Sequence, residues 1–511
     1  MTRPSRIQWS RVAQILQAQG PVSGPRLARD LGVSLATLHR HLKAHPDGWL
    51  QSGQASRRRY ALRRSVAGIE ETSLPVMRID AEGRAHDAGT LTPIAPEGCH
   101  FDLQALGWPV DEAQRDGWWE SLPYPILDMR PQGYIGRRYA RALSDTLPIP
   151  ANPTLWSDDD ILRVIGRHGA DLPGDLVVGQ ASIERWYRER VGGEPPVAVW
   201  DRQADYPALA RQAMAETLPA SGVGGEFPKF TTWCTDPETG APTPVIVKFS
   251  APDDGSAVVQ RWRDLLYCEH LASRALAGIA GVSASQTRVI DTDSRRFFEI
   301  ERFDRQGAFG RRPVSTLAAI DPALVGLFSH DWRVEIAALH RHGWLDAAGC
   351  AAVSRQWWFG QMIANSDMHP GNLAFRAVAA DEQRQGQPRF EPTPAYDMLP
   401  MAYAPLTSGE IREPDFDPPM PQPGEFADWQ AAAEAAIVFW TTVAETSHIG
   451  TALRRAGEAN ARTLERMGGQ IGGSGRQFKG CDTSSRLLAH PQYVLISVYR
   501  GCVKTMWVTS V

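Results

Sequence analysis

The sequence predicts an α+β protein in which a small basic helical module is followed by a β-rich lobe and then by a helical lobe. Three observations predict this order. Residues 1–64 contain twelve Lys and Arg against two Asp, a balance of +10, whereas the remaining residues balance at −14. Strand signals are found in residues 205–305. Apolar residues recur with helical spacing in 315–380 and again in 424–466.

The composition is that of a globular protein with several domains. A chain of 511 residues with 43% apolar residues is long enough for about three domains. No apolar run approaches the ~20 residues that span a bilayer, and no hydrophobic signal segment follows the first residues. We therefore expect a soluble, cytoplasmic protein with no membrane partner. Six scattered cysteines without a C-x-x-C pair argue against a zinc site and a disulfide framework.

The first 65 residues are predicted to form a winged helix-turn-helix. Trp9–Leu16 and Gly24–Leu31 have helical apolar spacing, Gly32 and Val33 supply a tight turn, and Ser34 can cap a third helix over Leu35–Leu42. A hairpin follows, formed by residues 48–51 and 59–62. Helix, turn and helix in this order place the last helix in the major groove of DNA.

The basic excess of this module suggests a polyanion partner, and duplex DNA is the expected one. The residues expected to face DNA are Ser34, Ala36, Thr37, Arg40 and Lys43 on the third helix and Arg57, Arg58 and Arg59 after the hairpin tip. The residues expected to face the core are Leu35, Leu38 and Leu42. The alternative is a basic helical module that has no role in DNA binding.

Residues 66–200 mix short strand signals, such as Val76–Ile79, with turns rich in glycine and proline. The segment Arg130–Arg137 has a distinctive sequence, but no chemical role can be derived from it. Packing is its expected role.

Residues 201–310 contain a candidate phosphate site. Ser221–Lys229 is a glycine-rich loop, and glycines let backbone N–H groups approach phosphate oxygens. A β-branched strand, Thr243–Phe249, contains Lys248, which alternation places opposite its apolar neighbours, toward solvent or a polar cleft. Glu269 lies on the following helix, Trp262–Leu276, and is the expected partner of this lysine. A flexible turn and an ordinary edge lysine are the alternatives.

The segment Asn365–Asn372 is the most informative of the chain. It places Asp367 and Asn372 five positions apart, and Asp397 follows twenty-five residues later. Phosphoryl transfer from ATP needs a carboxylate that orients and deprotonates the attacking hydroxyl, and oxygen groups that hold a metal ion on the phosphates. The order of these acidic residues and the Asn looks like the catalytic loop and metal-binding Asp of a protein kinase, but the usual H-R-D and D-F-G motifs are not present. The alternative is a pair of capped loops, since these are turn residues.

Together these residues resemble the HipA family of toxin Ser/Thr protein kinases. The matching segments are the glycine-rich loop with Pro228 and Lys229, the strand around Lys248, Glu301–Arg305, Asp367–Asn372 and Tyr396–Pro400. The resemblance covers roughly residues 66–465. The fused N-terminal module is similar to that of single-chain members, because DNA binding belongs to a separate antitoxin in the two-gene members.

The resemblance implies a two-lobed protein-kinase-like fold that uses ATP and Mg²⁺. Asp367 would be the catalytic base, and Asn372 and Asp397 would hold the metal. The residues implied to bind or line the nucleotide are Gly222, Val223, Gly224, Gly225, Lys229, Lys248, Glu269, Glu301, Arg302, Phe303 and His369. The implied divisions are an N-terminal subdomain of the HipA type at 66–200, a small lobe at 201–310 and a helical large lobe at 311–467. An irregular tail without assigned function is expected at 468–511.

One position departs from the family pattern. The self-phosphorylated serine of the glycine-rich loop falls on Gly222, and Ser221 lies one position earlier, so Ser221 is the possible autophosphorylation site.

The sequence therefore predicts an ATP-dependent Ser/Thr kinase toxin with a fused DNA-binding domain. The resemblance suggests a translation component, such as an aminoacyl-tRNA synthetase, as its protein substrate. A homodimer on DNA is possible, because such modules usually bind repeated half-sites. The alternative is a DNA-binding transcriptional regulator whose kinase-like body is inactive or senses a ligand.

Overall fold

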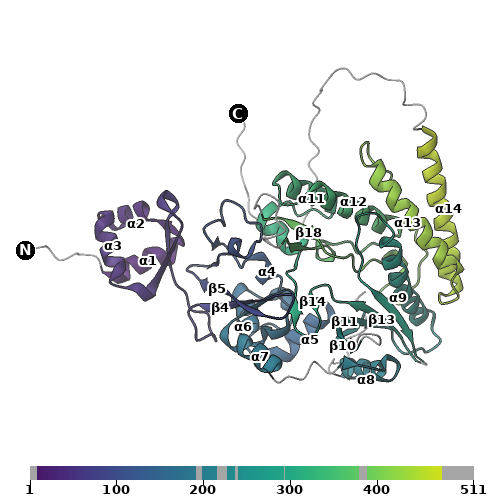
Figure 1. Ribbon diagram of the computed structural model, residues 1–511, viewed down its shortest axis with the longest axis horizontal. Coiled ribbons are helices and arrows are strands. Elements are labelled where there is room, and N and C mark those ends of the chain that lie inside the picture. Colours follow the sequence, from purple (N-terminus) through teal and green to yellow (C-terminus); the bar gives the residue numbers. More distant parts are fainter. Residues whose placement is uncertain are drawn as a thin grey trace, which may run out of the picture. The chain divides into compact units, whose positions relative to one another are not determined.

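The computed structural model describes residues 8–191, 198–215, 227–235, 240–292, 294–378 and 388–474 (Figure 1). Helices and β-sheets are mixed throughout these ranges, so the α+β class is confirmed. The chain divides into two compact units, residues 1–466 and 467–511, and of the second only the helical start, up to Ser474, is described. No helix of the described residues is long and apolar enough to cross a membrane.

The N-terminal module consists of three helices and a small sheet. The helices are α1 (Trp9–Gln19), α2 (Gly24–Leu31) and α3 (Leu35–Lys43). The strands β1 (Val22–Ser23), β2 (Trp49–Ser52) and β3 (Arg59–Leu62) form an antiparallel sheet in the order β1-β3-β2. The turn after α2 works as expected: Gly32 has a φ of 66°, and the Ser34 hydroxyl accepts a hydrogen bond from the Thr37 N–H at 3.2 Å.

The core of this module differs from the expected one at a single leucine. Leu38 and Leu42 are buried, together with Val12, Leu16, Leu27 and Leu31. Leu35 is 41% exposed, so its placement in the core was wrong. It is the first residue of α3 and lies beside Gly24, and among the described residues its side chain remains partly open to solvent.

The middle region, residues 66–191, contains a five-stranded sheet in the order β7-β6-β5-β4-β8. Its strands are β4 (Leu74–Ile79), β5 (Ala85–Pro93), β6 (Cys99–His100), β7 (Trp118–Trp119) and β8 (Leu176–Val178). Its helices are α4 (Tyr124–Leu127), α5 (Gly133–Ser144), α6 (Asp158–His168) and α7 (Gln180–Val191). The hairpin β2–β3 packs on this region through Ala61, Ile94 and Trp118.

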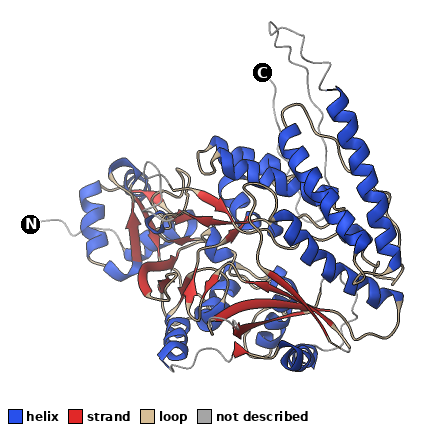
Figure 2. Cartoon of the chain, turned by 45° about the vertical axis from the view of Figure 1, so that its right-hand side comes forward, coloured by secondary structure: helices blue, strands red, loops and turns tan. Residues whose placement is uncertain are grey.

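The β-rich lobe is a second five-stranded sheet, in the order β12-β13-β11-β10-β9 (Figure 2). Its strands are β9 (Ala198–Val199), β10 (Lys229–Thr235), β11 (Pro242–Phe249), β12 (Thr287–Asp291) and β13 (Arg296–Glu301). Helix α8 (Arg202–Ala215), which the strand signals did not predict, packs its Tyr206 on Val245 and Val247. Helix α9 (Ala257–Leu276) lies on the opposite side of the strands (Figure 1).

The helical lobe begins after the short pairs β14 (Arg305–Gln306) and β15 (Gly310–Arg311). It contains α10 (Leu317–Ile320), a π-helix (Asp321–Val325), α11 (Trp332–Arg341), α12 (Ala347–Met362), α13 (Phe426–Glu445) and α14 (Thr451–Ser474). A three-stranded sheet joins β16 (Ser315–Thr316), β17 (Ala374–Ala377) and β18 (Phe390–Pro392). The helix α14 continues to Ser474 and so includes the first residues of the segment expected as an irregular tail. A glycine in a helix costs only about 1 kcal/mol relative to alanine.

Candidate active site

A buried ion cluster joins the two lobes. The Lys248 ammonium on β11 lies 2.6 Å from Glu269 Oε1 on α9 and also contacts Asp397 Oδ1, in the loop after β18. Lys248 is only 6% exposed, so it does not face solvent and lies instead among the charged side chains of this cluster. Alternation along β11 produces this placement, because Val247 and Phe249 are buried against α8 on the other face.

This cluster holds the Glu269 and Asp397 carboxylates and the Lys248 ammonium, and Lys229, which lies across from Lys248 in the antiparallel pair, adds a second positive charge that acts on both carboxylates. Burial raises the pKa of Glu269, and the charge of Asp397 adds to that rise. Burial alone would raise the pKa of Asp397 as well, but the Lys248 ammonium lowers it overall. Glu269 Oε2 is buried and has no hydrogen-bond partner among the described residues. The unpaired Glu269 Oε2 and the Asp397 carboxylate are oxygen ligands of the kind that a divalent metal ion prefers, although the described residues contain no group of three or more His, Cys, Asp or Glu side chains that could hold a metal ion by themselves.

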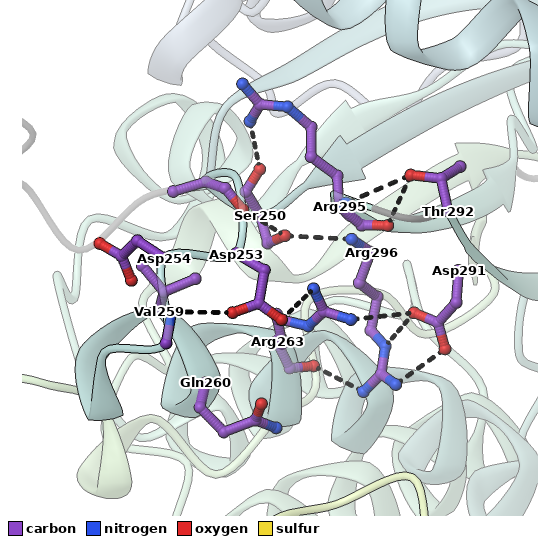
Figure 3. A network of polar contacts seen from close by, with 12 residues as sticks. Ser250, Asp253, Asp254, Val259, Gln260, Arg263, Asp291, Thr292, Arg295 and Arg296 are labelled. Carbon is purple, nitrogen blue, oxygen red and sulfur yellow. Dashed lines mark hydrogen bonds and ion pairs between the residues drawn. The ribbon is translucent and has the colours of Figure 1, made fainter.

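A network of charged residues fixes the strand and the helix that supply the Lys248–Glu269 pair (Figure 3). The Arg296 guanidinium holds Asp291 at 2.7 and 2.9 Å, and it also donates to the backbone oxygen of Arg263 on α9 at 3.2 Å. Arg263 in turn lies 3.3 Å from Asp253. The Arg296 N–H donates to the Ser250 hydroxyl at 3.1 Å, two residues beyond Lys248. The end of β11 is therefore tied to α9 through β13.

The predicted catalytic loop follows directly on the end of α12. Asn365 is buried, and its side-chain oxygen accepts a hydrogen bond from the Asp367 N–H at 3.1 Å, while its amide donates to the Asp397 carbonyl at 3.3 Å. The Asp367 side chain is exposed, and within the described part of the chain no hydrogen bond holds it. A substrate hydroxyl can therefore approach this carboxylate.

Asn372 lies at the other end of the same loop. Its amide nitrogen donates to the Asp367 carbonyl at 2.7 Å, which leaves the amide oxygen able to bind a metal ion. The Tyr396 hydroxyl donates to the Gly371 carbonyl at 2.7 Å, so the segments that contain Asn372 and Asp397 are in contact. Asp397 has a φ of 55°, a left-handed conformation that costs an L-residue about 1–3 kcal/mol and is common at functional sites.

His369 precedes the short helix Pro370–Asn372. Its Nδ1 accepts a hydrogen bond from the Gly371 N–H at 3.0 Å. The ring is exposed beside the loop, and it acts as a cap in this structure.

The predicted hinge residues line a cavity of about 490 Å³ at the end of β13. Glu301, Arg302 and Phe303 all border it, but its lining in the described chain does not include Lys248 or Asp397. The Phe303 ring lies 5.5 Å from the Tyr396 ring, which follows β18. The hinge residues therefore lie together near the ion cluster, but the cavity that they border is not lined by Lys248 or Asp397.

The residues after the hinge were quoted in the sequence motif without a role, and the structure gives them one. Asp304 accepts hydrogen bonds from Arg302 at 2.9 and 3.0 Å and from Arg305 at 2.7 Å. Arg305 also holds Asp171 of the middle region at 2.8 Å. Although burial opposes it, the two guanidinium groups lower the pKa of Asp304. The alternation of Arg and Asp at the end of a strand was the available signal.

The glycine-rich loop cannot be placed. Ser221, Gly222, Val223, Gly224 and Gly225 lie outside the described residues. Lys229 is described as the first residue of β10, and it lies directly across from Lys248 in the antiparallel pair.

The side chains predicted to face DNA are exposed or partly exposed, and one of them, Arg57, also contacts another part of the chain. Ser34, Arg40, Lys43, Arg58 and Arg59 are exposed, and Thr37 is half-buried, with its hydroxyl 3.0 Å from that of Ser34. Arg57 instead lies 3.1 Å from Asp116 of the middle region. Among the described residues, Arg57 therefore forms an ion pair with another part of the chain, while its side chain remains 47% exposed.

Comparison with known proteins gives two matching family models. Residues 70–187 match the model described as the middle domain of YjjJ-like toxins, and residues 221–463 match the HipA-like C-terminal domain. The first model describes part of a toxin and the second a HipA-like domain, and together they define the class of this protein as HipA-like. Toxin YjjJ of Escherichia coli strain K12 is 34% identical over 462 residues, which cover 90% of this chain and 99% of that protein.

Two solved structures are also similar. One is the complex of HipA, HipB and operator DNA from Shewanella oneidensis MR-1, with 14% identity and a TM-score of 0.41 over 77% of this chain and 94% of the other. The second is the proinflammatory kinase CtkA of Helicobacter pylori, with 10% identity and a TM-score of 0.32 over 49% of this chain and 91% of the other. From the two family models and the identity to toxin YjjJ, the chain belongs to the HipA-like toxin family, among its YjjJ-like members.

Proposed function

We propose that this HipA-like toxin is a Ser/Thr protein kinase that uses ATP and Mg²⁺. The main supporting observation is the cluster of Lys248, Glu269 and Asp397, in which a strand lysine is paired with a helical glutamate, and to which Asn365 links the loop of the exposed Asp367 by hydrogen bonds to the Asp367 N–H and the Asp397 carbonyl. This arrangement provides the lysine–glutamate pair and the carboxylates that kinase catalysis requires.

The residues have distinct roles in this proposal. Asp367 accepts the proton of the substrate hydroxyl, because it is exposed and oriented by the hydrogen bond of its N–H to Asn365. Asn372 and Asp397 would hold Mg²⁺, which neutralises charge on the phosphates when bound. Lys248 would donate to the phosphates, and its ion pair with Glu269 would keep it in place. The backbone of Glu301–Phe303 would border the adenine, and Lys229 and His369 would lie beside the phosphates.

The N-terminal module is proposed to be a winged helix-turn-helix that binds duplex DNA. Three helices, a β-hairpin and the exposed cations Arg40, Lys43, Arg58 and Arg59 support this proposal. The solved HipA complex contains operator DNA, which is a property of that complex. A dimer on repeated half-sites, a cytoplasmic location, a translation component as protein substrate and autophosphorylation of Ser221 remain parts of the proposal.

The deciding experiment is a phosphorylation assay with purified protein, labelled ATP and a cell lysate. The wild-type chain should label a defined protein, and the Asp367→Ala chain should not. If neither labels any protein while both bind DNA, the second candidate applies: a DNA-binding regulator whose kinase-like body senses a ligand. The basic module, which a kinase does not need, is the observation that favours this second candidate.

A further inference from the structure

One acidic side chain of the middle region, Asp128, forms hydrogen bonds to the helical lobe. This residue ends α4, and its carboxylate accepts two hydrogen bonds from Thr316: one from the backbone N–H at 2.6 Å and one from the hydroxyl at 2.8 Å. Burial raises the pKa of Asp128, and the two bonds from Thr316 partly offset this rise. A partly buried carboxylate with two donors from one residue has a strongly fixed geometry.

Thr316 is directly connected to the predicted metal site. It belongs to β16 and pairs with Ala374 of β17, which begins two residues after Asn372. The next residue, Leu317, donates its N–H to the Leu373 carbonyl at 2.7 Å. The short helix α10 also packs on the helix Pro370–Asn372. Only two hydrogen-bonded steps therefore separate Asp128 from the residue that follows Asn372.

The helix α4 is itself fixed in place. Tyr124 is fully buried, and its hydroxyl donates to the Pro109 carbonyl at 2.8 Å. Its ring lies 6.1 Å from the ring of Phe390 on β18, which belongs to the same sheet as β16 and β17. The middle region therefore packs on this sheet with apolar contacts and adds one polar contact at its edge. Packing alone does not require a carboxylate at this position.

We infer that Asp128 of the middle region is a positioning residue for the metal site, acting through Thr316 and β17 on Asn372. The inference rests on the proposed function, because it takes Asn372 as a metal ligand. Partners that orient metal ligands from outside typically change metal affinity by about 10–100-fold when they are removed.

The test compares the wild-type chain with Asp128→Ala, Asp128→Asn and the control Asp145→Ala. Asp145 is exposed at the end of α5 and also belongs to the middle region. Binding of a non-hydrolysable ATP analogue is measured at increasing Mg²⁺ concentration, and amide hydrogen exchange is measured over residues 315–320 and 371–375. The Asp128→Ala chain should need about 10-fold more Mg²⁺ for half-maximal binding and should exchange faster in both segments. The control should match the wild type.

The asparagine variant separates positioning from a loss of folding. Its amide oxygen can still accept from the Thr316 N–H, and its amide nitrogen can donate to the Thr316 hydroxyl, so it should remain close to the wild type. If Asp128→Ala does not fold, Thr316→Val removes the hydroxyl bond alone and should raise the Mg²⁺ requirement to a smaller extent. The inference is overturned if Asp128→Ala or Thr316→Val keeps the wild-type Mg²⁺ requirement for analogue binding. It is also overturned if Asp128→Asn raises that requirement as much as Asp128→Ala does. A wild type that binds the analogue but transfers no phosphate refutes the kinase proposal and leaves this inference intact.

Discussion

The N-terminal module and the ion cluster of the candidate active site differ in where their charges lie and which residues they pair with. In the module, Arg40, Lys43, Arg58 and Arg59 are exposed, and the capping bond from Ser34 to Thr37 spans three residues. In the cluster, Lys248 is buried and its carboxylate partners lie 21 and 149 positions away in the sequence. Exposed cations can be removed one by one with little structural effect, whereas a buried pair fails as a unit.

Arg57 lies between these two cases. It belongs to the module by sequence, but its partner Asp116 lies in the middle region, and the hairpin packs there through Ala61 and Trp118. The charge of Arg57 therefore contributes to the contact between two parts of the chain. Whether an arginine of the module is available to a ligand therefore depends on the partners that lie beside it in the fold, and not on the residue type alone.

The largest effect is expected at Asp367. Asp367→Asn should lower phosphoryl transfer by about 10²–10⁴-fold, because an amide cannot accept the substrate proton. Nucleotide binding and the unfolding temperature should remain unchanged, since this side chain is exposed. Turnover is measured with labelled ATP and binding by calorimetry. As a contrast, Asp397→Ala should weaken metal-dependent nucleotide binding. Full activity of the Asp367→Asn chain would refute its role as base.

The next effect concerns the buried cluster. Lys248→Ala leaves Glu269 and Asp397 without their cation, so it should lower the free energy of unfolding by up to about 3–5 kcal/mol as well as turnover. Denaturant unfolding measures the loss. A double variant, Lys248→Met with Glu269→Gln, removes both charges of the buried pair and should lose less stability. Equal losses in the two chains would show that the pairing of charges is not the cause.

A smaller effect is expected for the arginines of the module. Binding of the full chain to duplex DNA should weaken steeply with salt, and Arg58→Ala or Arg59→Ala should each reduce the salt slope by roughly 0.9. Arg57→Ala should change it less, because Asp116 already holds that guanidinium. Changes at Thr37 or Arg40 should alter sequence preference instead. Gel-shift titrations at several salt concentrations measure these slopes. Equal slopes for Arg57→Ala and Arg58→Ala would remove the distinction between them.

The smallest effect concerns pH and the module. Burial, followed by the charge of His45, lowers the pKa of His41 below its usual 6.5. The unfolded chain therefore binds more protons than the folded chain at mildly acidic pH, and the stability of the module should fall as the pH drops through 6.5. His41→Gln removes this dependence, so the wild type should lose unfolding temperature relative to that variant at pH 5 but not at pH 7.5. Parallel pH curves for the two chains would contradict the lowered pKa.

The sequence alone determined the elements whose causes are local. The Ser34 cap, the left-handed Gly32 turn and the alternation that turns Lys248 away from Val247 each depend on a few neighbouring residues. The same holds for the predicted catalytic loop, in which one hydrogen bond joins Asn372 to Asp367 across five positions. Periodicity and capping act over one or two turns, so these features can be predicted from the order of residues.

Only the tertiary structure decided which distant side chains meet. The pairing of Lys248 with Asp397 as well as Glu269, and the reach of Asp128 to Thr316, join residues separated by as many as 188 positions. The exposure of Leu35 and the ion pair of Arg57 with Asp116 were likewise set by which element lies beside them. Helix and strand propensities and the spacing of apolar residues do not specify which distant residues become neighbours. Sheet register and helix packing place them, and burial then makes their charges depend on one another.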